Sequence, residues 1–185
     1  MYIAMSTELP SLGNERLRNT ARITIVAATY NEKYTTALLD NCLAELKEYE
    51  ELLTVNVVRV PGAFELPMMV KRAIATAPEG RGPDAVIALG VILRGSTAHA
   101  DLIGDAITRQ LLSISCDALI PVIHEVLLLD NEQQAFARCI ASALNRGREA
   151  ARAAIEMLRV LETEHALGSI NKRTAGLDPH GSLLS

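Results

Sequence analysis

The sequence predicts a single-domain α/β protein, in which a four-stranded parallel sheet forms the middle layer of a three-layer α/β/α sandwich. Two observations lead to this fold class. Apolar runs of strand length alternate with segments whose apolar residues recur every three or four positions, the pattern of βα units with right-handed crossovers. The run at 85–93 is apolar throughout, which is typical of a strand buried on both faces of a parallel sheet.

The individual elements follow from periodicity and from turn signals. Strands are predicted at residues 23–28, 53–60, 85–93 and 119–129. Helices are predicted around 39–46, at about 65–77, through 102–114, from a cap at Asn131 to about 144, and at about 148–162. Pro67 fits the second helix because it lies in the first turn, and Gly147 is expected to mark the break between the last two helices.

Composition limits the classes of partner and compartment. A formal net charge of −4 and an aromatic content of 3% argue against a general binder of nucleic acids or anionic membranes. No apolar run approaches the roughly 20 residues that span a bilayer. The three cysteines, Cys42, Cys116 and Cys139, have no metal-ligand spacing and are interpreted as buried thiols in a reducing compartment. A cytoplasmic protein without a metal is therefore expected.

The chain divides into a domain and two flanking segments. Residues 1–20 are polar and are expected to form a flexible N-terminal arm without the apolar core of a signal peptide. The α/β domain is expected to comprise residues 21–164. Residues 165–185 are predicted to form a disordered C-terminal tail.

Chemistry-bearing side chains follow the strand 85–93 directly. Gly95 lets the backbone approach a phosphate group, and Ser96 and Thr97 could add hydroxyl donors at the N-terminus of the next helix. His99 is expected about one helical turn further on, where it could exchange a proton with an anchored substrate. The alternative is that Ser96 and Thr97 only cap the helix.

The other strand ends add candidates, because ligands of parallel sheets bind beyond the carboxyl ends of the strands. Tyr30 and Phe64 both fall at such ends, where they either pack within the protein or stack on a flat ligand. Glu65 either binds ligand hydroxyls or amines or complements a helix dipole. Arg138 is either a solvent-facing cation or a phosphate ligand, if its helix faces the turn at 96–97.

Several mechanisms lack their residues in this sequence. A Schiff-base enzyme needs a desolvated lysine beside its substrate, and no lysine follows a predicted strand end. The glycine-rich Gly-x4-Gly-Lys-Ser/Thr pattern of phosphoryl transfer and the serine nucleophile elbow are both absent. What remains is a site with a phosphate anchor, a histidine and a stacking surface.

At these residues the chain resembles the lumazine synthase family of riboflavin biosynthesis. The resemblance runs from about residue 22 to 160 and rests on segments in matching order. They are Ala-Thr-Tyr-Asn-Glu at 28–32, Val-Pro-Gly-Ala-Phe-Glu-Leu-Pro at 60–67, Gly-Val-Ile-Leu-Arg-Gly-Ser-Thr-Ala-His-Ala-Asp at 90–101, Pro-Val-Ile at 121–123, 132–138, and Ala-Ile-Glu-Met at 154–157.

The resemblance implies a flavodoxin-like sheet and a cofactor-free reaction. The family condenses 5-amino-6-(D-ribitylamino)uracil with 3,4-dihydroxy-2-butanone 4-phosphate, giving 6,7-dimethyl-8-ribityllumazine and phosphate. The pyrimidine supplies the amine, so the Schiff base forms between the two substrates. Family members are homo-oligomers (pentamers, decamers or 60-subunit shells) with sites between neighbouring subunits, so the segment 123–124 would come from the adjacent chain. Riboflavin synthase is a candidate partner.

The resemblance also implies roles for residues of this sequence. Tyr30 would stack on the pyrimidine ring, and His99 would donate and accept protons. Ser96, Thr97 and Arg138 would bind the phosphate group. The expected catalytic residues are His99 and Arg138. The remaining binding residues would be Asn31, Ala63, Phe64, Glu65, the backbone of Val91, Ile92 and Leu93, His124, and Arg146.

Two departures from the family pattern support an alternative. His124 stands where the family usually has Phe, so a titratable ring replaces part of the stacking wall. The segment 139–147 keeps the usual length but lacks the usual glycines and lysine, with Arg146 as the cationic substitute. The alternative function is a non-catalytic flavin- or lumazine-binding shell protein of the same fold. A third hypothesis, a flavodoxin-like nucleotide-binding module, would not require both Glu65 and Arg138.

Overall fold

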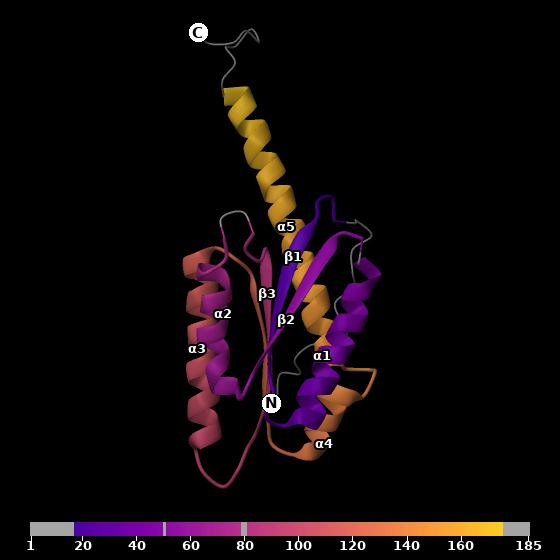
Figure 1. Ribbon diagram of the computed structural model, residues 1–185, viewed down its shortest axis with the longest axis vertical. Coiled ribbons are helices and arrows are strands. Elements are labelled where there is room, and N and C mark those ends of the chain that lie inside the picture. The colour runs from indigo at the N-terminus through magenta and orange to yellow at the C-terminus, as the bar shows by residue number, and fades with distance from the viewer. Residues whose placement is uncertain (1–16, 50, 79–80, 176–185) are drawn as a thin grey trace, which may run out of the picture.

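A parallel sheet of four strands, in the order β2-β1-β3-β4, forms the centre of the protein and confirms the predicted fold class (Figure 1). The structure is a computed structural model that describes residues 17–49, 51–78 and 81–175, with side chains described as far as residue 165. The strands are β1 (Ala21–Ala28), β2 (Leu53–Val60), β3 (Ala85–Leu93) and β4 (Val122–Leu129). All neighbouring strands pair in parallel, so their carboxyl ends share one edge.

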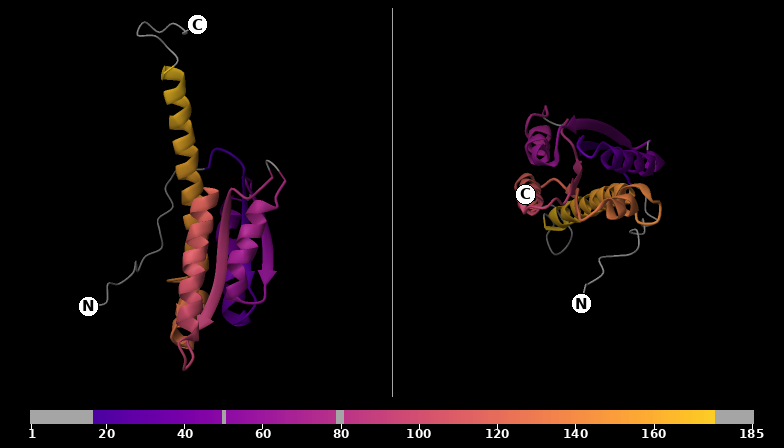
Figure 2. Two further views of the ribbon diagram at one scale, coloured as in Figure 1. Left: turned by 90° about the vertical axis from the view of Figure 1, so that its left-hand side faces the viewer. Right: turned by 90° about the horizontal axis from the view of Figure 1, so that it is seen from below.

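Helices cover both faces of the sheet, which gives the three layers (Figures 1 and 2). One face carries α2 (Leu66–Ala75) and α3 (His99–Ala118), and the other carries α1 (Glu32–Leu46), α4 (Glu132–Ala135) and α5 (Arg146–Ala175). Three shorter helical segments join them: η1 (Lys47–Tyr49), η2 (Ala63–Glu65) and the π-helical η3 (Phe136–Ile140). The far end of α5 extends beyond the body of the protein in Figure 1.

The core consists of two apolar clusters, one on each face of the sheet. Alternate residues of β3 serve the two clusters: Ile87 and Leu89 face α1 and α5, whereas Val86 and Ala88 face α2 and α3. The first seven residues of β3 are buried, as the apolar run at 85–93 predicts. Gly90 leaves room for close packing, because a Cβ there would lie 3.1 Å from both Leu66 and Val126 side-chain atoms.

Two boundaries differ from the sequence-based prediction. β4 begins at Val122 rather than at 119, because Leu119 terminates α3 in the left-handed region with a φ of 54° and is 85% exposed. The helix capped by Asn131 was expected to reach about 144. It instead changes to the π-helical η3 at Phe136 and ends before Ala141, which is extended.

The buried side chain of Asn145 connects η3 with α5. Its Nδ2 donates to the Cys139 carbonyl at 2.8 Å, and its Oδ1 accepts from the amides of Gly147 and Arg148. Asn145 therefore satisfies one backbone group at the end of η3 and two at the start of α5. The helix begins at Arg146, so the prediction that Gly147 breaks the chain is wrong.

Gly147 instead allows α5 to lie directly against α1. A Cβ at this position would overlap the carbonyl oxygen of Leu38, which is backbone and cannot move aside cheaply. The same contact is held by charge, since Arg148 and Arg152 donate to the two carboxylate oxygens of Glu45 at 2.8 and 2.6 Å. Burial opposes ionisation of Glu45, but these hydrogen bonds prevail and its pKa is lowered.

The expectations for the cysteines and for the two ends of the chain are confirmed only in part. Cys42 and Cys139 are buried, and burial raises the pKa of both thiols to about 12, whereas Cys116 is exposed and corrects the expectation of three buried thiols. The predicted arm at 1–20 and tail at 165–185 fall partly outside the described residues, at 1–16 and 176–185. Within the described chain, α5 continues past 165 to Ala175, and no helix has the length and apolarity to cross a membrane.

Replacing Gly147 with Ala tests the contact between α1 and α5. We expect Gly147→Ala to lower the free energy of unfolding by about 3 kcal/mol, because the added methyl group collides with backbone. Gly82→Ala is the matched control, since a Cβ there meets only the Ala77 Cβ at an ordinary 3.5 Å. Urea denaturation of both variants measures the difference; equal stabilities would contradict the contact.

Candidate functional site

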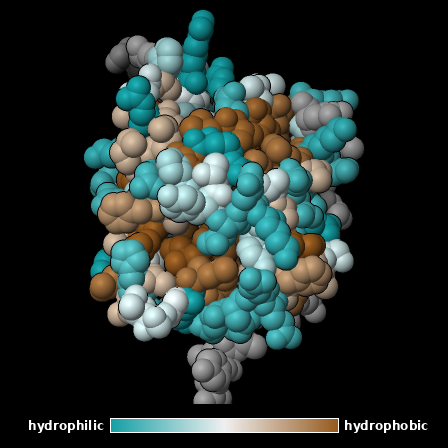
Figure 3. All heavy atoms as spheres, turned by 60° about the horizontal axis from the view of Figure 1, so that its bottom comes forward, coloured by the Kyte–Doolittle hydropathy of each residue, from teal (hydrophilic) through white to brown (hydrophobic). Residues whose placement is uncertain are grey.

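The loops that follow the four strands meet at one end of the protein, the lower end in Figure 1. Figure 3 turns this end toward the viewer and shows hydrophobic side chains exposed among hydrophilic ones. The exposed hydrophobic residues of these loops include Tyr30 and Phe64, which are 69% and 65% exposed. Neither ring is buried in the core, so packing does not account for them, and both are available for stacking.

The loops after β1 and β2 are joined around Gly62. The Thr29 hydroxyl and the Tyr30 amide both donate to the Pro61 carbonyl, at 2.9 Å each. The Glu65 carboxylate accepts from the Gly62 amide at 2.8 Å. A Cβ on Gly62 would lie 3.0 Å from Glu65 Oε2 and 3.1 Å from the Tyr30 ring, so the glycine brings ring and carboxylate together.

Asn31 ties the loop after β1 to β3. It adopts the left-handed conformation with a φ of 58°, which asparagine tolerates better than most residues, and it precedes α1. Its Nδ2 donates to the Val91 carbonyl at 2.8 Å. This hydrogen bond joins the loop after β1 to the carboxyl end of β3, and the expected substrate contact of Asn31 stays a prediction.

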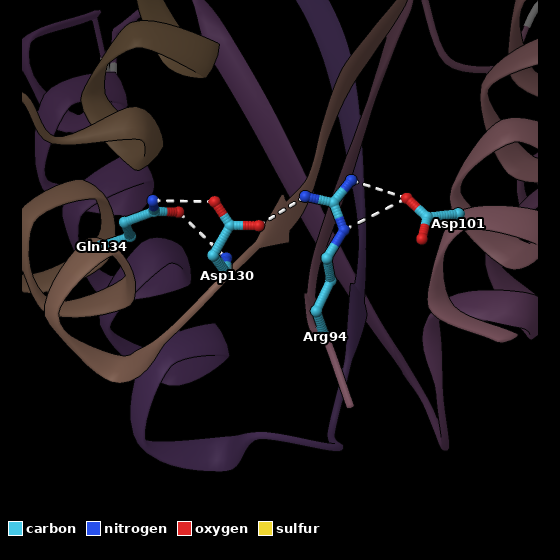
Figure 4. A network of polar contacts seen from close by, with 4 residues as sticks. All are labelled: Arg94, Asp101, Asp130 and Gln134. Atoms are coloured by element: carbon cyan, nitrogen blue, oxygen red, sulfur yellow. Dashed lines mark hydrogen bonds and ion pairs between the residues drawn. The ribbon is translucent and has the colours of Figure 1, made fainter. Parts of the chain in front are cut away.

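An ion-pair network fixes the start and end of the β3–α3 connection (Figure 4). The Arg94 guanidinium donates two hydrogen bonds to Asp101 Oδ1, at 2.6 and 3.1 Å, and also pairs with Asp130 after β4. Asp130 exchanges two further hydrogen bonds with Gln134 of α4. Hydrogen bonds from Arg94 and Gln134 hold the pKa of Asp130 below its ordinary value.

Ser96, Thr97 and His99 lie within this braced connection and are all exposed. The N-cap of α3 is Ala98, without a side-chain cap bond, so neither hydroxyl caps the helix. The capping hypothesis for Ser96 and Thr97 is therefore wrong. His99 is the first residue of α3 rather than one turn into it, so it lies two residues after Thr97 at the start of the helix.

A second group of predicted residues lies along β4, at the opposite edge of the sheet from β2. A groove of about 630 Å³ follows this edge strand and contains His124, Arg138 and Arg146 among its lining residues. The Arg146 side chain is only 12% exposed and pairs with Glu149 at 2.5 Å. Ser96 and Thr97 are not among the lining residues of this groove, so within the described part of the chain it does not join the hydroxyls to these cations.

Glu125 lies beneath the same groove and was not predicted. Its side chain is 11% exposed, and its Oε1 lies 3.9 Å from Nε of Arg146. Burial raises its pKa to about 8, although the charges of Arg146 and Arg138 act in the opposite direction. At neutral pH this carboxyl group is therefore mostly protonated.

His124 points to the other face of β4. Its Nε2 lies 3.0 Å from the hydroxyl of Thr108 on α3, and that hydroxyl also donates to the Gly104 carbonyl at 2.8 Å. Because a hydroxyl has one proton to donate, it must accept from Nε2 of His124, which therefore carries a hydrogen. Burial lowers the pKa of His124, so the ring is held neutral against α3.

Comparison with known proteins identifies the family of the chain. A family model described as 6,7-dimethyl-8-ribityllumazine synthase matches residues 20–162. The chain belongs to the 6,7-dimethyl-8-ribityllumazine synthase family. The match includes both groups of residues described above, those at the strand ends and those along β4. Resemblance in the sequence segments and the observed parallel sheet agree with this assignment.

Curated relatives of the same name cover most of the chain. The 6,7-dimethyl-8-ribityllumazine synthase of Pectobacterium atrosepticum is 40% identical over 144 residues, which is 77% of this chain and 90% of that protein. Those of Nitrobacter hamburgensis and Chlorobium phaeobacteroides are 38% and 40% identical over 141 residues, 76% of this chain and 85% and 88% of theirs. The chain is an enzyme with lumazine synthase activity in riboflavin biosynthesis.

Relative to the lumazine synthase expectations, the structure separates the predicted residues into two groups. The larger group belongs to the strand ends and the loops after them, and in it Ala63 and Val91 are buried. Its members are Tyr30, Ala63, Phe64, Glu65, Val91, Ile92, Leu93, Ser96, Thr97 and His99. Arg138 and Arg146 belong to the β4 groove, and His124 lines the groove while its ring contacts Thr108 of α3. Sequence reasoning missed Glu125, although a carboxylate inside an apolar strand is a signal that could have been followed.

Arg94→Ala tests whether the ion pairs hold the β3–α3 connection. Arg94, Asp101 and Asp130 are about half exposed and their ion pairs are screened by solvent, so the loss of global stability should be small. Locally, we expect the amides of residues 95–98 to exchange hydrogen about 5- to 10-fold faster. Arg109→Ala is the control, because its exposed pair with Asp105 lies within α3. Unchanged exchange in Arg94→Ala would contradict the bracing.

Glu125 should also make stability depend on pH. Its pKa is about 8 in the folded protein against an ordinary 4.5, so the unfolded chain releases this proton first. The free energy of unfolding therefore falls as pH rises from about 4.5 to about 8 and then levels off. We expect Glu125→Gln to remove this component, so that its Tm exceeds the wild-type Tm most at pH 8–9. The exposed Glu132→Gln should keep the wild-type profile.

Proposed function

We propose that this lumazine synthase condenses 5-amino-6-(D-ribitylamino)uracil with 3,4-dihydroxy-2-butanone 4-phosphate at a site built from two copies of the chain. The observation that supports it is the division of the candidate residues. Stacking, hydroxyl and histidine groups gather at the strand ends, whereas Arg138 and Arg146 line the separate β4 groove. A neighbouring copy would bring its groove to the strand ends of the first, which makes the active enzyme a homo-oligomer.

The strand ends after β1, β2 and β3 form the pyrimidine half of the proposed site. Tyr30 offers an exposed ring beside the Glu65 carboxylate, with Gly62 between them. One oxygen of Glu65 accepts from the Gly62 amide, and the other can accept from a ribityl hydroxyl. Phe64 would add a second apolar wall, and the polar edge of the ring would meet backbone groups of residues 91–93.

The phosphate half combines Ser96 and Thr97 with the partner's arginines. Their hydroxyls make no cap of α3 and can donate to an anion at its N-terminus, where the helix dipole is favourable. A guanidinium group such as that of Arg138 adds two parallel donors and a full positive charge. Holding the phosphate in this way fixes the ketone of the second substrate beside the amine of the first.

His99 is proposed to move the protons of the reaction. Forming an imine from an amine and a ketone expels water, so a proton must reach the departing hydroxyl group. Elimination of phosphate requires removal of a proton from carbon. His99 follows Ser96 and Thr97 at the start of α3, so a phosphate bound by their hydroxyls would place its neighbouring carbons near the start of the same helix. Association with riboflavin synthase and a cytoplasmic location stay predictions.

Turnover with both substrates tests the reaction. We expect phosphate release and a fluorescent product, and we expect His99→Ala to lower kcat by about 10- to 100-fold, the usual contribution of general acid–base catalysis or somewhat less. Stopped-flow fluorescence measures the rate of product formation in the wild type and in His99→Ala. Substrate or product binding without turnover above the spontaneous rate would instead support the non-catalytic shell protein.

Arg138→Gln tests the phosphate assignment separately. Removing the cation should raise KM for the ketose phosphate by at least about 10-fold and leave KM for the pyrimidine within about 2-fold, because the guanidinium group contacts only the anion. Steady-state kinetics with each substrate varied in turn measures the two KM values separately. A change confined to the pyrimidine would overturn the assignment, and mass measurement in solution checks the oligomer.

A further inference from the structure

We propose that Glu125 and Glu149 hold Arg146 in place, and that the charge on Glu125 sets how tightly the β4 groove binds the phosphate of the substrate. Both would be positioning residues for the proposed reaction, because they act through Arg146. The inference rests on the proposed function, in which Arg146 and Arg138 receive the phosphate group.

The first step is the position of Arg146. Its side chain is almost enclosed, with 12% exposed, so its direction is set by what it touches within the chain. Nη1 lies 2.5 Å from Glu149 on the same helix, and Nε lies 3.9 Å from Glu125 on β4. The guanidinium group is thus held between α5 and the edge strand, and it faces the groove without a search through rotamers.

The second step is the surroundings of Glu125. Its carboxyl group lies on the face of the sheet that α1, η3 and α5 cover. Among the described residues, five titratable or charged groups face it. They are Cys42 on α1, Arg138 and Cys139 on η3, and Arg146 and Glu149 on α5. Both thiols have a pKa of about 12 and stay neutral, so Arg138, Arg146 and Glu149 are the charges that matter.

The third step is the charge of the groove. With Glu125 protonated, Arg138, Arg146 and Glu149 sum to one positive charge beside the phosphate. With Glu125 ionised, the sum is zero, and the new negative charge lies next to the guanidinium group that must bind a dianion. Burial gives Glu125 a pKa of about 8, so the groove changes charge within the range in which the substrate phosphate stays doubly ionised.

The proposal predicts that phosphate binding depends on pH through the ionisation of the Glu125 carboxyl group. In the wild-type enzyme we expect KM for the ketose phosphate, and the dissociation constant of inorganic phosphate, to rise about 10-fold between pH 7 and pH 9.5 with a midpoint near 8. In Glu125→Gln both should stay nearly constant over this range. Steady-state kinetics and calorimetry at constant ionic strength measure the two quantities.

Two further variants separate this role from a general effect of charge. Glu149→Gln should tighten phosphate binding, because Arg146 loses a competing carboxylate, and should move the midpoint to lower pH, because the negative charge of Glu149 helps to raise the pKa of Glu125. Glu156→Gln removes an exposed carboxylate from the same helix, which pairs with Arg159, and should match the wild type throughout. A wild-type pH profile in Glu125→Gln would overturn the proposal.

Failure of the proposal is distinguishable from failure of the proposed function. If Arg146→Gln weakens phosphate binding while Glu125→Gln keeps the wild-type profile, the phosphate site stands and the role of Glu125 falls. If neither Arg146→Gln nor Arg138→Gln changes phosphate binding, the proposed site itself is wrong. Carbon-13 NMR of the wild-type Glu125 carboxyl group needs no variant: bound phosphate should raise its titration midpoint, and an unmoved midpoint overturns the proposal.

Discussion

Every loop of the candidate site depends on the central strand β3. The loop after β1 is held by the bond from Asn31 to the Val91 carbonyl, and the segment after β2 approaches the sheet closely because residue 90 is glycine. The connection to β4 is made by the Arg94 amide, which donates to the Leu129 carbonyl at 2.9 Å. A strand buried on both faces cannot shift without exposing its apolar side chains, so the strand ends share a rigid reference.

Much of this arrangement could be predicted, because burial leaves a strong pattern in sequence. Three of the four strands begin and end within two residues of their predicted bounds, since each is a continuous apolar or β-branched run. The change from α4 to the π-helical η3 could not be predicted, because 136–140 has the same apolar spacing as an ordinary helix. What ends it is the side chain of Asn145, a tertiary contact with no periodic signature.

The polar residues of the site could be predicted from the sequence, but the contacts between them could not. Ser96, Thr97 and His99 follow a strand directly, and a general rule about strand ends selects them. The partners of Arg94 lie 7 and 36 residues away, and nothing local indicates that Asp101 and Asp130 flank one guanidinium group. Glu125 shows the same limit: its meaning comes from Arg146, which is distant in sequence and adjacent only in the fold.

The contact at Gly147 has a consequence for how the chain folds as it is made. α5 supplies Ala150, Ala154, Ile155 and Leu158 to the cluster that covers β1 and α1, so this half of the core stays uncovered until α5 has been synthesised. A nascent chain that ends before α5 exposes part of one apolar sheet face, a surface prone to aggregation. The last helix to be synthesised therefore completes this half of the core.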